Sequence, residues 1–283
     1  MSPLNRGYLY GDAIYEVWRS YHGVIFAWQE HGARLVASAK ALGMAIGWSP
    51  TELLTEVKRT VAAFRDHENF RGEVYIRLQI SRGDGAVGLA TALADEPGFI
   101  ILVQPVPLMS PEKLEQGLNL HIAKQLRRNA PDTLNPAWKT GNYLNNLLCL
   151  REARESGADD AVILNQATAI TEASTSNIGF IVGGKFITPP LSAGILAGIT
   201  RRFIIDRVAA SAGLSVEERT VRPADLATIE EALLLSTTKD VQPVARIDEH
   251  TFAVGPDTAT RRLKAAFAAF AHQHSDAHPE LSV

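Results

Sequence analysis

The sequence predicts an α+β protein built from two domains. Short apolar runs rich in β-branched residues alternate with longer segments that repeat apolar residues every three or four positions, which are the patterns of strands and amphipathic helices. A length of 283 residues suits one large or two medium domains. The proline-rich segment PVPLMSP at 105–111 is typical of an interdomain connection. We therefore expect a small N-terminal domain at 1–104, a linker at 105–112 and a larger C-terminal domain at 113–283.

The first domain is expected to contain a hairpin, two helices and two further strands. AIYEVWRSYHGVIFAW predicts two strands joined at Tyr21-His22-Gly23. HGARLVASAKALGM predicts a helix that ends near Gly43, and SPTELLTEVKRTVAAF a helix capped by Ser49, with Glu52 three positions later. GEVYIRLQISRG and PGFIILVQPVP are β-rich runs bounded by glycine and proline.

The second domain continues the alternation. GLNLHIAK and DDAVILN are strand candidates, and a loop and helix follow Lys139 between them. ITEASTSNIGFIVGGKFITPP predicts a turn and then a hairpin through Gly183-Gly184. GITRRFIIDRVAASAG predicts a helix, EEALLLSTTKDVQPVARID a strand, turn and strand, and TATRRLKAAFAAFAHQH a closing helix. We expect HQHSDAHPELSV to be a loose polar tail without a metal site, because its histidines lack a fixed scaffold.

Composition excludes several classes of function. The chain is 46% hydrophobic and 21% charged with a net charge of −3, which describes a globular protein without a basic surface for nucleic acid. The single cysteine, Cys149, lies among leucines, and we expect it to be buried filler. No apolar run approaches the ~20 residues of a membrane span, and the N-terminus has no signal-peptide pattern. A cytoplasmic enzyme acting on small molecules is the expectation.

Lys139 is the residue in this chain that most suggests chemistry. It precedes an amphipathic helix and is surrounded in sequence by aromatic, small and amide residues, and a lysine in such partly dry surroundings can act as a nucleophilic amine. Glu172 precedes a turn of small residues, and Gly198-Ile199-Thr200 opens a helix whose free N–H groups favour a phosphate. Thr237-Thr238 ends a strand and adds hydroxyls. Each of these alone has an ordinary structural explanation as a solvated, capping or turn residue.

Seven segments in order resemble the class IV aminotransferases, the fold-type IV pyridoxal-phosphate enzymes, over nearly the whole chain. They are GDAIYE (11–16), EHGARL (30–35), YIR with RGDG (75–85), RRNAPDTLNPAWKTGNYLNN (127–146), ITEASTSN (170–177), GILAGITR (194–201) and LSTTKDVQPV (235–244). The resemblance implies the two-domain fold of that family, a homodimer and pyridoxal 5′-phosphate as cofactor. It also implies small amino and keto acids as substrates, and no nucleic acid or membrane partner.

The resemblance also implies a role for individual residues. Lys139 matches the lysine that binds the cofactor covalently and then moves the substrate proton, and Glu172 matches the acid that faces the pyridine nitrogen and keeps it protonated. The remaining matches to cofactor-binding positions are Arg34 for the phosphate, Ile199 and Thr200 for the helix-end amides, Thr237 for a hydroxyl, Tyr143 for the phenolic oxygen and Asn177 as support for Glu172.

The substrate-binding candidates are Tyr15, Arg19, Tyr75, Arg77 and Thr238. Tyr15, Val17 and Arg19 share one face of a predicted strand, as Tyr75 and Arg77 do on another. Tyr75-Ile76-Arg77 is similar to the branched-chain aminotransferase pattern, and an arginine suits a carboxylate such as that of glutamate. GDAIYEV instead resembles the D-amino-acid aminotransferases, but their Arg-x-His element is missing from GDGAVGLAT. Packing of half-buried tyrosines and a structural ion pair of Arg77 are the alternatives to substrate binding.

We therefore expect a transaminase that moves an amino group between a branched-chain L-amino acid and 2-oxoglutarate. The alternatives are a D-amino-acid or (R)-amine transaminase, an aminodeoxychorismate lyase of the same fold, and a cofactor-binding module without catalysis. Family members usually have a further strand pair before the segment that matches LNRGYLYGD, with an aspartate in place of Asn5. Either the first sheet lacks a strand or the gene start is placed late.

Overall fold

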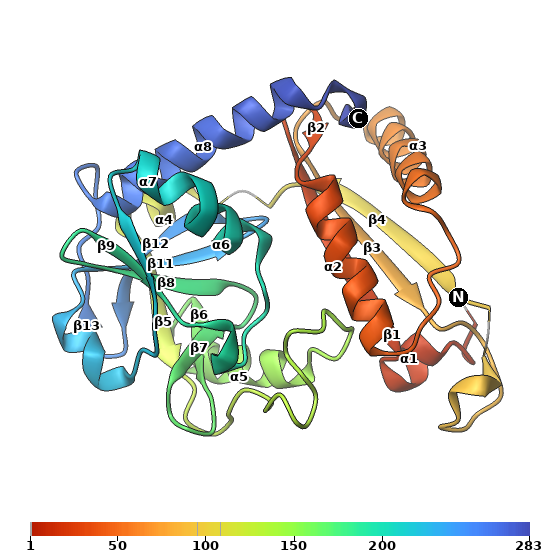
Figure 1. Ribbon diagram of the computed structural model, residues 1–283, viewed down its shortest axis with the longest axis horizontal. Helices are drawn as coiled ribbons and strands as arrows, with labels where there is room; N and C mark the ends of the chain where they lie inside the picture. Colours follow the sequence, from red (N-terminus) through yellow and green to blue (C-terminus); the bar gives the residue numbers. More distant parts are fainter. Residues whose placement is uncertain (1, 95, 108) are drawn as a thin grey trace. The chain divides into compact units, whose positions relative to one another are not determined.

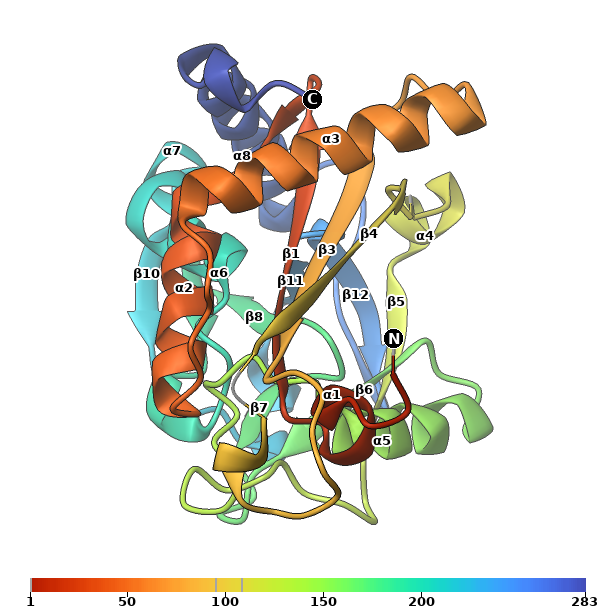
Figure 2. The ribbon, with the colours of Figure 1, turned by 90° about the vertical axis from the view of Figure 1, so that its right-hand side faces the viewer.

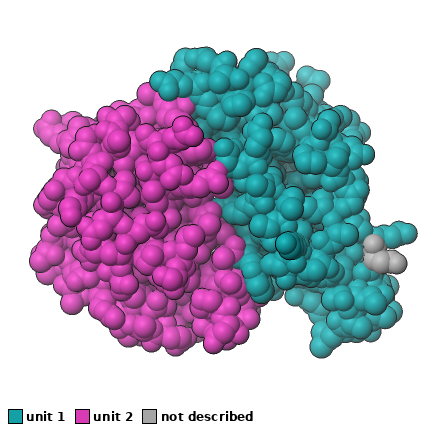
Figure 3. All heavy atoms as spheres, viewed as in Figure 1, with its two compact units in different colours: residues 1–107, 138–142, 271–283 teal, residues 108–137, 143–270 magenta. Residues whose placement is uncertain are grey.

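The computed structural model describes residues 2–94, 96–107 and 109–283, which form two compact units (Figures 1 and 3). Unit 1 comprises residues 1–107, 138–142 and 271–283, and unit 2 comprises 108–137 and 143–270. Each unit combines a sheet with helices, so the predicted α+β class is confirmed. Leu108 of the predicted linker lies outside the described residues. The helices of the described part of the chain include none with the length and apolar character to cross a bilayer.

Unit 1 is built on a four-stranded antiparallel sheet in the order β2-β1-β3-β4, of which Figure 2 shows β1, β3 and β4 side by side. Its elements are α1 (Arg6–Tyr10), β1 (Ala13–Tyr21), β2 (Val24–Ile25), α2 (Trp28–Ala41), α3 (Pro50–Glu68), β3 (Val74–Ser81), a 3₁₀ turn (Thr91–Leu93) and β4 (Gly98–Pro105). The predicted hairpin turn is present, with His22 and Gly23 both at positive φ. The predicted cap of α3 is also present, since the Glu52 N–H donates to Ser49 Oγ over 3.2 Å and Glu52 Oε2 accepts from the Ser49 N–H over 2.7 Å.

The two faces of this sheet differ because side chains alternate along each strand. Ile14 and Trp18 of β1 and Ile76 and Leu78 of β3 point into a core that also contains apolar residues of α2 and α3. The opposite face carries the intervening positions of β1 and β3. The register brings Val17 opposite Arg77.

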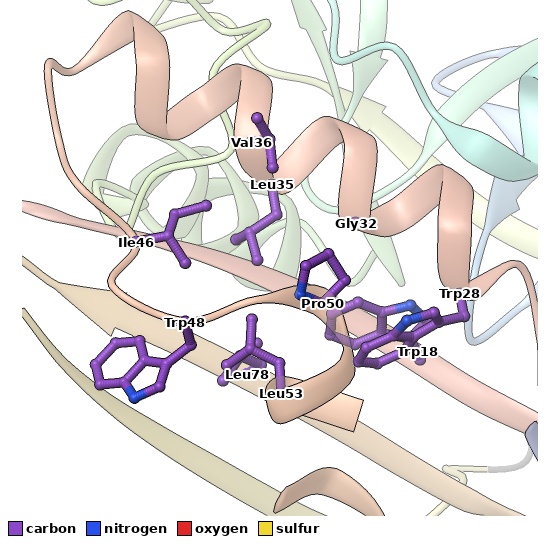
Figure 4. Close-up of a pocket in the computed structure, with 10 residues that line it drawn as sticks. All are labelled: Trp18, Trp28, Gly32, Leu35, Val36, Ile46, Trp48, Pro50, Leu53 and Leu78. Carbon is purple, nitrogen blue, oxygen red and sulfur yellow. The ribbon is translucent and has the colours of Figure 1, made fainter. Parts of the chain in front are cut away.

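An apolar cavity of about 50 Å³ lies within unit 1, between α2 and the sheet (Figure 4). Trp18 and Trp28 stack at its wall with ring centroids 4.8 Å apart, and Gly32 of α2 faces it without a side chain. Its wall is therefore almost wholly hydrocarbon. Gly32 is the lining residue of α2 that has no side chain to fill the space.

The C-terminal segment differs from the expectation of a loose tail. The last helix, α8 (Ala259–Ala277), continues beyond the predicted end, and a 3₁₀ turn (Pro279–Leu281) follows it. Ser275 Oγ donates to the Tyr21 carbonyl over 2.9 Å, and Leu281 is 1% exposed. The ring of His274 lies 4.7 Å from that of Phe26. The expectation was wrong because it counted the histidines as solvated polar residues, whereas an imidazole also packs well against an aromatic ring.

Unit 2 is built on a nine-stranded mixed sheet. Its strand order is β10-β9-β8-β11-β12-β5-β6-β7, with β13 beside β12 and a further pairing of β7 with β8. The elements are α4 (Pro111–Gln116), β5 (Leu118–Ile122), α5 (Leu144–Glu155), β6 (Asp160–Leu164), β7 (Ile170–Ala173), β8 (Asn177–Val182), β9 (Lys185–Thr188), α6 (Ile199–Phe203), a π-helical turn (Ile204–Val208), α7 (Ala209–Ser211), β10 (Ser215–Glu218), β11 (Glu231–Ser236), β12 (Asp240–Ile247), β13 (His250–Thr251) and most of α8, with 3₁₀ turns at Leu191–Ala193 and Pro223–Thr228.

Two segments of unit 2 differ from the structure expected from the sequence. ITEA, predicted as a turn, is strand β7, because it pairs with β6 and buries all four residues. The helix predicted at 198–213 is present but contains the π-helical turn, a local insertion of one residue into helical winding. Cys149 is fully buried, as expected.

Candidate functional site

The predicted site residues divide between the two units. Unit 1 holds Lys139, Arg34, Tyr15, Arg19, Tyr75 and Arg77. Unit 2 holds Tyr143, Glu172, Asn177, Ile199, Thr200, Thr237 and Thr238.

Lys139 belongs to a five-residue stretch, 138–142, that lies against β1 and α2 of unit 1. The Tyr15 N–H donates to the Lys139 carbonyl over 3.0 Å, and the Lys139 N–H donates to Ser38 Oγ over 3.1 Å. These bonds fix the backbone on both sides of the residue. The side chain is half-buried, and its Nζ lies 4.4 Å from the centre of the Tyr15 ring. Contact with an aromatic face favours a lysine held in one place.

The face of the sheet that carries Tyr15 also carries the other predicted substrate residues. The register places Arg19 opposite Tyr75 and Val17 opposite Arg77. The Arg77 guanidinium lies 3.8 Å over the Tyr15 ring and donates to Gln79 Oε1 over 2.9 Å. Arg77, Tyr15 and Lys139 are therefore brought together. Arg19 stacks instead on Tyr21, at 4.1 Å from its ring centre.

Arg34 makes an ion pair with a buried carboxylate on the opposite, core-facing side of β1. Its Nε donates to Glu16 Oε1 over 2.7 Å and its Nη2 to Glu16 Oε2 over 2.8 Å. His31 Nδ1 lies 2.7 Å from Glu16 Oε2. An ionised carboxylate can only accept, so His31 Nδ1 carries the hydrogen. A guanidinium has five N–H donors, and the pair with Glu16 is therefore compatible with a second anionic partner.

The electrostatics of this group follow from its burial. Burial alone would raise the pKa of Glu16, but Arg34 and His31 outweigh it and hold that pKa well below its ordinary value. Burial lowers the pKa of His31, and Glu16 opposes the shift while Arg34 and Lys139 reinforce it. Glu16 is thus an anion and His31 is neutral at physiological pH. The two hydrogen bonds from Arg34 to the Glu16 carboxylate give the guanidinium a fixed orientation.

In unit 2, three donors converge on the carboxylate of Glu172. Arg128 Nη2 donates over 2.6 Å, Asn177 Nδ2 over 2.9 Å and the Leu196 N–H over 3.2 Å. Glu172 and Asn177 are each 5% exposed. A carboxylate buried among such donors is stabilised as an anion. The predicted support of Glu172 by Asn177 is therefore present as a hydrogen bond.

Asn177 also connects Glu172 to the start of α6. Its Nδ2 donates to the Leu196 carbonyl over 3.0 Å, and Gly198, the N-cap residue of α6, lies against its amide. A Cβ built on Gly198 would lie 1.8 Å from Asn177 Oδ1. Ile199 and Thr200 follow in the first turn, as the sequence predicts, where backbone N–H groups have no partner within the helix.

Tyr143, Thr237 and Thr238 lie at the edges of this group. Tyr143 occupies the N-cap position of α5, one turn before Asn146, which accepts from Arg128 over 2.9 Å. Thr237 and Thr238 are half-buried in the turn between β11 and β12. The register of β11 with β8 places Leu235 opposite Asn177, so the turn begins two residues beyond that pair.

Sequence reasoning did not single out the partners of the predicted residues. Glu16 carries a signal, because an acid between Ile14 and Trp18 on the core face of a strand must find a cation. Arg128 carries none, since its arginine doublet precedes an irregular loop. Glu16 lies in the motif GDAIYE and Arg128 in RRNAPDTLNPAWKTGNYLNN, but neither motif indicated what these two residues do.

Each unit offers its own groups for binding a ligand. Unit 1 offers a fixed primary amine and an arginine held by a buried anion. Unit 2 offers a buried carboxylate and a helix start that favours anions. A primary amine suits an aldehyde group, a buried carboxylate suits a basic ring nitrogen, and an arginine or a helix start suits a phosphate.

Comparison with known proteins agrees with this chemistry. The family described as amino-transferase class IV matches residues 13–247. The chain is 35% identical to a putative branched-chain-amino-acid aminotransferase of Methanocaldococcus jannaschii, over 88% of this chain and 83% of that protein. It is 31% identical to a D-alanine aminotransferase of Bacillus licheniformis, over 93% of this chain and 88% of that protein.

A solved structure shares the fold. The branched-chain amino acid aminotransferase of Escherichia coli superimposes with a TM-score of 0.86 at 29% identity, covering 95% of this chain and 88% of that one. The fold predicted from the sequence resemblance is thereby confirmed.

Proposed function

The chain belongs to the class IV aminotransferase family and is a pyridoxal-phosphate-dependent transaminase, and we propose that it transfers the amino group of a branched-chain L-amino acid to 2-oxoglutarate. The observation that carries this proposal is the sheet face of unit 1 near Lys139. It combines the apolar Val17 and the ring of Tyr15 with the guanidinium of Arg77. A transaminase that uses branched-chain amino acids and 2-oxoglutarate must accept an apolar side chain and a dicarboxylate in turn, and this face offers surface for both.

We propose that the two sets of residues serve one cofactor. Pyridoxal phosphate supplies an electron sink for the charge that develops at the substrate's Cα. Lys139 would hold it covalently through Nζ, and the same nitrogen, once released, would take the proton from the substrate's Cα and deliver it to the C4′ carbon of the cofactor. Glu172 holds a proton on the ring nitrogen, with Asn177 keeping the carboxylate in place. Arg34, the first-turn amides of Ile199 and Thr200, and Thr237 hold the phosphate, and Tyr143 donates to the phenolic oxygen.

Substrate residues are assigned in the same proposal. Arg77 receives the distal carboxylate of the dicarboxylate, and Tyr15 and Tyr75 line the side-chain position. Arg19 and Thr238 are the remaining substrate residues of the proposal. Arg19 is included because it lies on the same face of β1 as Tyr15. The D-amino-acid transaminase is the second candidate, favoured by the similarity to the Bacillus licheniformis enzyme.

We also propose that the enzyme is a homodimer. The edge strand β4 exposes Ile100 and Leu102, at 52% and 48%, on the face that carries Arg77. Exposed apolar residues on an unpaired edge strand favour association with another chain. Light scattering coupled to size exclusion should give a dimer mass for the wild type and a smaller mass for the Leu102→Lys variant. An unchanged mass would place the interface elsewhere.

The experiment that tests the reaction is a panel of half-reactions with the cofactor-loaded protein. L-leucine should convert the bound cofactor to its amine form, whereas D-alanine, (R)-1-phenylethylamine and aminodeoxychorismate should react at least about tenfold more slowly. Fast conversion of D-alanine with inert L-leucine would select the second candidate, and reaction with aminodeoxychorismate would select the lyase.

The cofactor lysine is tested by absorbance. Wild-type protein with pyridoxal phosphate should show a band near the visible edge that borohydride removes. Lys139→Ala should lack the band, and Lys185→Ala, in which an exposed lysine of β9 is removed, should keep it. A wild-type protein without the band would refute the assignment of Lys139.

A further inference from the structure

Unit 2 contains a lysine and a carboxylate that are paired largely out of contact with water. Lys239 Nζ lies 3.2 Å from Asp160 Oδ2, and the two side chains are 19% and 6% exposed. Burying two charges costs free energy that a surface pair does not incur, so such a pair is often retained for a reason other than stability. Neither residue has a role in the proposed function.

The pair connects two turns of unit 2. Lys239 lies in the turn between β11 and β12, where its N–H donates to Ser236 Oγ over 3.2 Å. Its Nζ crosses to the turn between β7 and β8 and donates to Ser176 Oγ over 3.0 Å. Asp160, at the start of β6, accepts from the hydroxyl of Ser174 in that same turn. One buried ion pair therefore holds both turns.

Both turns carry residues of the proposed site. Glu172 lies near the end of β7, just before the turn of residues 174–176, and Asn177 follows that turn, while Thr237 and Thr238 immediately precede Lys239. Successive N–H and hydroxyl groups in a turn form a site for a carboxylate, provided that the turn keeps its shape. A displacement of about 1 Å at such a site is enough to lose productive binding.

We propose that Lys239 is a positioning residue for the substrate. By joining Asp160 and Ser176, it holds the turn of Thr237 and Thr238 at a fixed place beside the turn of residues 174–176. The hydroxyl and N–H groups of Thr238 then receive the α-carboxylate of the amino acid. This inference rests on the proposed transaminase function and adds a residue that does not itself touch substrate or cofactor.

Steady-state kinetics of the cofactor-loaded enzyme separate positioning from catalysis. Lys239→Met should raise KM for the preferred amino donor about tenfold and change kcat by less than about threefold, because one oriented carboxylate contact is weakened. Lys239→Arg should keep KM close to the wild-type value, since it keeps the charge opposite Asp160. The control is Lys185→Met, which breaks an exposed pair with Glu217 and should leave both constants unchanged.

Hydrogen exchange of the cofactor-free protein gives a readout that does not depend on activity. Lys239→Met should speed amide exchange at residues 173–177 as well as at 237–239, and Lys185→Met should change neither. If Lys239→Met does not fold, the pair Asp160→Asn and Lys239→Met removes both charges together and takes its place.

Three results would overturn the inference: unchanged exchange at 173–177, an unchanged KM, or a fall in kcat as large as the rise in KM. A wild-type enzyme that converts none of the four donors would refute the proposed function instead. The substrate role of Lys239 would fall with it, while the exchange experiment would still decide whether Lys239 joins the two turns.

Discussion

Gly198 shows how a single residue without a side chain determines the arrangement of two others. Its Cα lies so close to the Asn177 amide that a Cβ would overlap Oδ1, at 1.8 Å. Asn177 in turn donates to Glu172 and to the Leu196 carbonyl. The absence of one methyl group therefore allows the carboxylate and the start of α6 to share one amide.

Gly198→Ala should accordingly weaken cofactor binding. The methyl group must displace Asn177, and the loss of its two buried hydrogen bonds should cost about 2 kcal/mol or more. We expect pyridoxal phosphate affinity, measured by fluorescence titration, to fall at least about tenfold. Gly98→Ala is the matched control, because a Cβ there meets no atom within 4 Å. Equal affinities of the two variants would contradict the role given to Asn177.

Single residues were also where sequence reasoning was most uneven. The structure places Lys139 and Arg77 each beside the Tyr15 ring, and it places Glu172 beside Asn177, the one of these pairs that the sequence had already linked. The sequence did not identify the charged partners of the predicted residues. These are Glu16, which lies on the buried face of a strand, and Arg128, which lies in an irregular loop. An ion pair depends on which distant segments meet, and a linear pattern does not encode that meeting.

At the scale of elements, α2 combines a helix-breaking residue with missing volume. Gly32 lies within the helix, faces the apolar cavity and has nothing within 4 Å of a Cβ (Figure 4). Gly32→Ala should stabilise the protein by about 1 kcal/mol, because alanine is the better helix former and its methyl group enters empty apolar space. The midpoint of urea unfolding should rise.

Gly213 supplies the control for this prediction. A Cβ there also meets no atom within 4 Å, but φ is +76°, a region that disfavours residues with a side chain. Gly213→Ala should therefore destabilise the protein although the space is equally open. If both substitutions changed the midpoint in the same direction, backbone conformation would not be what separates them.

Helices and strands with a strong period were predictable, whereas departures from regularity were not. The capping box of α3 and the turn at His22-Gly23 follow from local chemistry and are present. The π-helical turn at 204–208 and the strand ITEA were missed. The π-helical turn adds one residue to the helix without changing its apolar pattern, so the pattern does not reveal it. The segment ITEA is a strand because it pairs with β6, which a local pattern does not show.

At the scale of the whole molecule, the buried His31 makes stability depend on pH. Burial lowers its pKa below the ordinary value of 6.5. As pH falls below that value, the unfolded chain binds a proton that the folded protein resists, so stability falls. We expect the unfolding free energy to decrease between pH 7.5 and 5.5 with a contribution from His31 of at most ~1.4 kcal/mol per pH unit.

His31→Asn should flatten this dependence, since an amide can still donate to Glu16 but does not titrate. Urea unfolding at a series of pH values measures the slope. His67→Asn removes an exposed histidine of α3 and should keep the wild-type slope. A His31→Asn variant with an unaltered slope would assign the pH dependence to other groups, of which the half-buried His274 is the next candidate.

Unit 1 is assembled from three separate stretches of chain, and this fixes an order of events during synthesis. Residues 1–107 leave the ribosome first. Residues 138–142, which carry Lys139 and in which Thr140 pairs with Ile14, follow later, and residues 271–283, which cover β2, come last. Closing such long loops is slow. The edge of β1 near Ile14 therefore stays unpaired until residues 138–142, with the reactive amine, have been made, and β2 is covered only when the last residues of the chain emerge.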